Sequence, residues 1–167
     1  MEARRLSKSA PQPFQLSLRI RHPSIDPAEL SREFQMEAEH CFRVGDPRSP
    51  RSNVAPPSVH AESYWLGLLK SPGRPVDVLF PENRSSQIAQ EHLAAATKTL
   101  GWALSLDAVR FLNSHVQILR RIRSEGGQIS LLVVISAAEV NNFSLAPEAS
   151  RVFGKLGITV EFELTGD

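Results

Sequence analysis

The chain has 167 residues, and its 19 Lys and Arg residues against 18 Asp and Glu residues leave a formal net charge of +1. This length fits one domain, and a composition of 41% apolar and 22% charged residues is that of a globular protein rather than a disordered one. The near-neutral total excludes a general electrostatic attraction to nucleic acid, and a single cysteine, Cys41, excludes an intramolecular disulfide framework.

The amino-terminal residues indicate a location. Residues 1–12 are polar and basic, and no apolar segment typical of a secretory signal follows them. No apolar run approaches the ~20 residues that a membrane helix needs. We therefore expect a flexible tail over residues 1–12, one α+β domain over residues 13–167, a cytoplasmic location and no membrane partner.

The first predicted element is a strand over residues 14–20. Its apolar residues alternate strictly with polar ones, which is typical of a strand with one face on a core and the other in water. The apolar set is Phe14, Leu16, Leu18 and Ile20.

A helix is predicted to follow at Asp26 and Pro27. Asp26 is a suitable N-cap, and proline is favoured at the first helical position. Glu29 is placed to accept from the cap's own N–H, while Ile25 and Leu30 occupy the positions of a hydrophobic staple. The end of this helix is predicted only roughly, near residues 34–36.

Two strands joined by a long connection come next. Residues 40–44 have strand propensity, and residues 61–70 predict a second long strand. The connection, residues 45–60, would be unusually long for a hairpin, so it is either functional or disordered. Residues 76–80 are compatible with a short edge strand or with a packed loop.

Helical spacing then recurs in two stretches. Apolar residues between positions 88 and 103 predict one helix, and those between 106 and 124 predict another, so the region holds two helices or one broken helix. The pair Gly126 and Gly127 is a natural helix stop.

The most apolar run, residues 128–135, predicts a strand in the interior of a sheet. A helix with Pro147 in its first turn and Gly157 as its C-cap follows. The last strand, residues 158–164, alternates again and is expected to point four residues inward: Ile158, Val160, Phe162 and Leu164.

These elements predict an α+β fold with an antiparallel or mixed sheet of four to five strands and helices mainly on one face. The order of elements favours a ferredoxin-like arrangement with an extra αβ unit. The other face of the sheet is expected to be partly open, and an exposed sheet face or edge is a common binding surface.

Short segments along the chain share the pattern of one known family. They are the alternating residues 14–20, Ile25-Asp26-Pro27-Ala28-Glu29-Leu30-Ser31, Arg43-Val44-Gly45-Asp46-Pro47-Arg48, Ser63-Tyr64-Trp65, Leu145-Ala146-Pro147-Glu148 and Leu156-Gly157-Ile158-Thr159-Val160-Glu161. Over most of residues 14–164 the chain resembles bacterial domain-of-unknown-function family 4279. It departs from that pattern at residues 35–40, where a Pro-Thr type of turn is expected, and at residues 71–104, which are longer. The resemblance implies a compact α+β domain and no particular activity.

Catalytic and metal motifs are missing from the sequence. The five histidines lack metal-ligand spacing, and one cysteine cannot complete a zinc site. No glycine-rich phosphate loop or H-E-x-x-H motif is present. We therefore expect no catalytic residue, no metal and no cofactor. A hydrolase or transferase stays open as an alternative if His40, His60 and Asp46 converge in space.

The most informative candidate for binding is a basic loop followed by an aromatic residue. Asp46 and Pro47 favour a turn, and the arginines present forked donors suited to carboxylates or phosphates. In the alternative interpretation Asp46 and Arg48 brace each other in a solvated loop while Trp65 packs in the core. The candidate binding residues are Arg43, Gly45, Asp46, Arg48, Arg51 and Trp65.

The functional hypothesis is a non-enzymatic bacterial protein-binding module, such as an immunity protein that neutralises a toxin. The first alternative is a domain that senses a small ligand or nucleotide through the basic loop, residues 43–51. The second alternative is an uncharacterised hydrolase or transferase. The partner is expected to be another protein, since no basic face studded with aromatic residues is visible that would favour nucleic acid.

Overall fold

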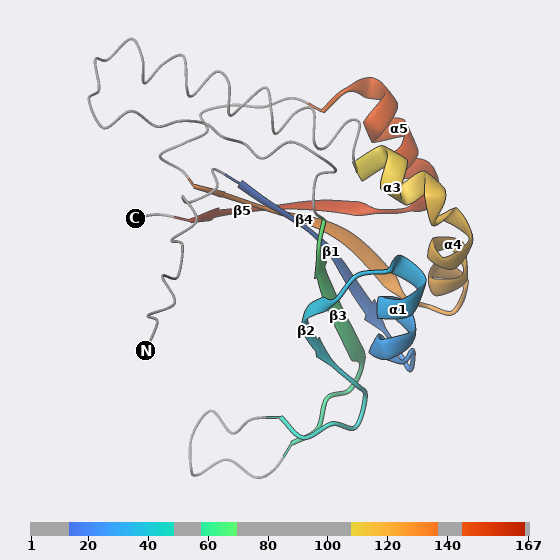
Figure 1. Cartoon of the computed structure of the whole chain (residues 1–167), viewed down its shortest axis with the longest axis vertical. Helices are drawn as coiled ribbons and strands as arrows, with labels where there is room; N and C mark the ends of the chain where they lie inside the picture. Colours follow the sequence, from blue (N-terminus) through green and yellow to red (C-terminus); the bar gives the residue numbers. More distant parts are fainter. Residues whose placement is uncertain (1–13, 49–57, 70–107, 137–144, 166–167) are drawn as a thin grey trace, which may run out of the picture.

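The computed structural model describes residues 14–48, 58–69, 108–136 and 145–165 (Figure 1). Several predictions fall outside these residues. They are the tail over residues 1–12, the strand or loop at 76–80, the helix over 88–103, and the candidate residue Arg51.

The described residues form an α+β fold built on a mixed sheet of five strands, in the order β2-β3-β1-β4-β5. Neighbouring strands run antiparallel except for β4 and β5, which are parallel. The predicted mixed sheet is confirmed, while the ferredoxin-like arrangement stays a prediction. The strands are β1 (Phe14–His22), β2 (Ala38–Phe42), β3 (Ser63–Leu68), β4 (Gln128–Ser136) and β5 (Thr159–Thr165).

The described helices lie together on one face of this sheet, as Figure 1 shows. The predicted placement of helices mainly on one face is therefore confirmed for the described residues. The helices are α1 (Pro27–Phe34), α3 (Ala108–Ser114), α4 (Val116–Ser124) and α5 (Pro147–Leu156).

The core lies between these helices and the central strands β1 and β4. Along β4 the residues that face the helices are at most 2% exposed, namely Ile129, Leu131, Val133 and Ile135. Full burial of one such side chain contributes about 1.5–3 kcal/mol relative to leaving it in water. Leu132 and Val134, on the other face, are half-buried. The predicted interior strand is confirmed.

The ends of two helices follow their local sequence signals. The Asp26 carboxylate accepts a hydrogen bond from the backbone N–H of Ala28 at 2.9 Å, and Pro27 begins α1. Gly157 ends α5 in the left-handed region, with φ of 62°. Glu29 differs from the prediction, because its carboxylate pairs with Arg121 of α4.

The helical stretch predicted after residue 105 is broken at His115, between α3 and α4. The imidazole Nδ1 of His115 lies 2.8 Å from the Phe111 carbonyl oxygen, and the Ser114 hydroxyl donates to the same oxygen. These side chains occupy the carbonyl that the next helical N–H would use, and the His115 N–H instead donates to Leu112 at 3.3 Å. Side-chain competition for one carbonyl therefore accounts for the break.

Two predictions about strands need correction. The strand predicted over residues 40–44 lies two residues earlier, at β2. In β5, Phe162 and Leu164 were expected to point into the core, yet their exposed fractions are 43% and 68%. Ile158 is buried and Val160 half-buried, because they lie near α5, whereas the second half of β5 runs past the described helices (Figure 1).

Candidate functional site

The face of the sheet opposite the helices, called the open face below, is covered by no helix among the described residues (Figure 1). The strand register determines which residues lie on the open face, because alternate residues of each strand point to opposite faces. It carries Gln15, Ser17, Arg19 and Arg21 of β1, Tyr64, Leu66 and Leu68 of β3, Leu132 and Val134 of β4, and Thr159, Glu161 and Glu163 of β5.

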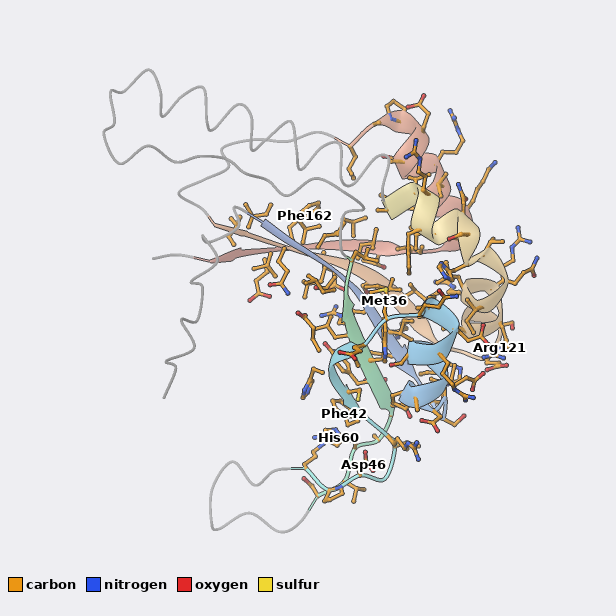
Figure 2. The ribbon with its side chains drawn as sticks, viewed as in Figure 1. Met36, Phe42, Asp46, His60, Arg121 and Phe162 are labelled. Carbon is orange, nitrogen blue, oxygen red and sulfur yellow. The ribbon has the colours of Figure 1, made fainter. Side chains whose placement is uncertain are left out.

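Four rings gather at the end of the sheet where β2 and β3 join the segments that connect them, and we call them the aromatic cluster: His40 and Phe42 of β2, Tyr64 of β3, and His60, which precedes β3. Phe42 stacks on His60 with ring centroids 3.5 Å apart and on Tyr64 with centroids 5.1 Å apart. The ring of His40 meets Phe42 and Tyr64 edge-on, at 5.8 and 5.7 Å. Figure 2 shows Phe42 and His60 beside each other at the end of the sheet.

Phe42 is the middle ring of this cluster. His60 and Tyr64 both stack on it but make no ring contact with each other, so they lie on opposite sides of it. Both faces of Phe42 are therefore occupied within the chain. The cluster offers ring edges and outer ring faces to a partner, and a flat ligand cannot enter the stack without separating it.

The chain continues beyond the aromatic cluster as a two-stranded projection, called the hairpin arm below and made of residues 43–48 and 58–62. Backbone hydrogen bonds of 2.8 Å join Gly45 to His60 and Arg48 to Ser58, so the pairing of β2 and β3 persists outward. Two valines on this arm are exposed, Val44 by 42% and Val59 by 59%. The arm extends away from the sheet, as Figure 1 shows.

The structure places the predicted binding residues in different environments. The Arg43 guanidinium donates to the Asp26 carboxylate at 2.7 Å, and the Asp46 carboxylate accepts from the Arg43 backbone N–H at 2.6 Å. Gly45 lies in the same turn with φ of 85°. Arg48 is exposed, and its side chain has no ion-pair partner among the described residues.

Trp65 lies in the core, on the face opposite the aromatic cluster. It is fully buried, and its indole N–H donates to the Ser31 hydroxyl at 3.0 Å. Its ring lies over Gly67, where an added Cβ would meet the ring at 2.3 Å. Trp65 therefore offers no surface to a ligand at the loop, which agrees with the alternative interpretation of this residue.

The charges of the open face are arranged around Tyr64. A hydrogen bond from the Ser130 hydroxyl, together with Arg19, lowers the pKa of Glu161. Burial raises the pKa of Tyr64, and the positive charges of Arg19 and Arg21 oppose that shift. At neutral pH the face thus carries an ionised Glu161 and a neutral phenol. Among the described residues the Tyr64 hydroxyl has no hydrogen-bond partner.

The hydrolase hypothesis required His40, His60 and Asp46 to converge. His40 and His60 both contact Phe42, but the Asp46 carboxylate is hydrogen-bonded to a backbone N–H and to neither imidazole. Within the described ranges, no three His, Cys, Asp or Glu residues are placed to hold a metal ion. The geometry around His40, His60 and Asp46 therefore provides no nucleophile with an oriented base.

The aromatic cluster was not predicted as a unit. The alternation of β3 separates Tyr64, on the open face, from Trp65, in the core, and this signal is visible in the sequence. The contact of Tyr64 with Phe42 and His60 depends on hairpin register across a long connection, which no local pattern fixes.

Comparison with known proteins leaves the function to be inferred from these residues. Protein-family models, curated proteins and solved structures give no significant match to the chain. Membership in family 4279 therefore stays a prediction. In the described part of the chain, no helix combines the length and apolar character needed to cross a membrane.

Proposed function

We propose that this chain is a non-enzymatic bacterial protein-binding module, whose contact surface joins the aromatic cluster to the hairpin arm. The observation that carries the proposal is the exposure of Val44 and Val59 on a projecting arm next to stacked rings. Exposed apolar groups beside aromatic rings are typical of protein interfaces, where aromatic residues are enriched.

The shape and the pairing of the arm favour a protein over a small ligand. Small-molecule sites are concave, whereas the arm projects from the sheet (Figure 1). The charged groups of Arg43 and Asp46 already have partners within the chain, so they are less available to a small anion. Sensing of a nucleotide or other small ligand through residues 43–51 is the weaker candidate for these reasons.

An immunity protein that neutralises a toxin is one form of such a module. A protein that blocks a toxin by covering its surface needs a rigid contact surface and no catalytic residues. The backbone hydrogen bonds of the hairpin arm make it rigid as far as Arg48 and Ser58. Where a neighbouring gene encodes a toxin, its product is the first partner to test.

The test is affinity capture from the source cell with three forms of the chain. They are the wild type, Val59→Glu on the arm, and the matched control Ser150→Glu, which adds the same charge at an exposed position of α5. We expect a stoichiometric protein partner whose binding Val59→Glu weakens at least about tenfold, as for a residue central to an interface. A partner that binds all three forms equally, or no stable partner in any growth condition, would contradict the proposal.

A further inference from the structure

We infer that the partner presents a cationic surface, with Lys or Arg side chains around an apolar centre, to the open face beside the aromatic cluster. This inference deepens the proposed function and rests on it. The evidence for it is the difference in charge between the two sides of the sheet.

The two arginines of the open face are already matched by carboxylates. Arg19 pairs with Glu161 of β5, and the Nε of Arg21 lies 3.7 Å from the Glu62 carboxylate. Neither guanidinium is therefore a free cation for a phosphate or for a carboxylate of the partner.

Two further glutamates on this side have no matching cation among the described residues. Glu39 is exposed, and its carboxylate accepts only from the neutral Gln15 amide at 3.2 Å. Glu163 is exposed on β5 and faces the same side as Val134. Over the described residues of the open face together with Glu62, two arginines against four glutamates leave two negative charges in excess, and the unpaired Arg48 lies further out on the hairpin arm.

The helix layer has the opposite sign. Among the described residues its helices hold one cation in α1, one in α3, three in α4 and two in α5, against two carboxylates in α1 and one in α5, and the capping residues Asp26 and Glu125 add two more carboxylates. The chain as a whole carries only +1. The charges are thus separated between the two sides of the sheet, and such separation steers a charged partner to one side.

This arrangement distinguishes between classes of partner. Phosphates of a nucleic acid would be repelled by the excess glutamates, and the faces of Phe42 are not available for base stacking. A cationic protein surface satisfies Glu39 and Glu163, while the half-buried Leu68, Leu132 and Val134, which lie between these two glutamates in the strand register, supply an apolar centre. Protein interfaces combine such a centre with a polar rim.

The experiment is a titration of the ¹⁵N-labelled full chain, followed by NMR, with three probes of equal length. They are a heptapeptide alternating lysine with leucine, its counterpart with glutamate in place of lysine, and an oligothymidylate. We expect the lysine peptide alone to shift amides of β1, β3 and β5 beside the open face. The double variant Glu39→Gln with Glu163→Gln should weaken that binding about fourfold, because each exposed charge contributes a factor of about two.

The matched control is Glu33→Gln with Glu148→Gln, which removes two exposed carboxylates from the helix layer and should leave the affinity unchanged. Equal binding of the glutamate peptide to the same amides would overturn the cationic partner while leaving the proposed function in place. Binding of the oligothymidylate there, or no shift with any probe, would likewise overturn the cationic partner, whereas the proposed function is decided separately by the affinity capture.

Discussion

At the scale of single residues, Gly157 shows how closely α4 and α5 fit together. It adopts a φ of +62°, its carbonyl accepts from the Arg123 guanidinium, and an added Cβ would lie 2.6 Å from that group. Gly157→Ala is therefore expected to lower the free energy of unfolding by about 1–2 kcal/mol, measured by urea denaturation. Gly154→Ala is the control, since nothing lies within 4 Å of its Cβ position inside α5. It should raise the same quantity by about 0.5–1 kcal/mol. Equal effects of the two changes would contradict this packing.

Glu161 predicts a pH dependence with a definite sign. Its pKa is lowered in the folded chain by the Ser130 hydroxyl and by Arg19. A carboxyl group whose folded pKa is lowered adds stability above its ordinary pKa of 4.5, and this stability is lost as the pH falls through the folded value. Between about pH 5 and about pH 3 the wild type should therefore lose more stability than Glu161→Gln. Identical acid profiles for the wild type and Glu161→Gln would show that these contacts do not form.

At the scale of elements, Asp26 joins the start of α1 to the hairpin arm. One carboxylate oxygen caps the Ala28 N–H, and the other accepts from Arg43. Asp26→Ala removes both contacts and should cost about 1–2 kcal/mol in the free energy of unfolding. Asp26→Asn keeps an oxygen for the cap and should cost less than about 1 kcal/mol, because an exposed ion pair contributes little. Urea denaturation of both variants decides between these roles. If the asparagine variant were as unstable as the alanine variant, the helix cap would not be the main contribution of Asp26 to stability.

Local signals predicted the elements whose ends and faces depend on neighbouring residues. The cap at Asp26, the stop at Gly157 and the apolar run of β4 each depend on a few adjacent positions, and the structure has all three. The contacts between distant residues were not predictable in this way. The break at His115 depends on competition for one carbonyl, and the exposure of Phe162 depends on where the helices end in space. The aromatic cluster likewise requires the register of β2 against β3.

At the scale of the whole molecule, the sheet separates two surfaces of different character. One side carries the helix layer with its excess of cations, and the other carries the aromatic cluster, the hairpin arm and the open face, where the described glutamates outnumber the arginines. Figure 2 places Arg121 on the first side and Phe42 with His60 on the second. A partner attracted by charge and held by apolar contact would therefore approach from the open face rather than over the helices.

Hydroxyl-radical footprinting of the chain, alone and with its captured partner, tests this binding surface most directly. The oxidation rates of Phe42, His60 and Tyr64 are compared with that of Trp65, which is fully buried and serves as an internal reference. We predict that the three rings oxidise in the free chain and are protected in the complex, while Trp65 reacts slowly in both. Protection confined to the helix layer, with unchanged rates at the three rings, would contradict a binding surface on the open side of the sheet.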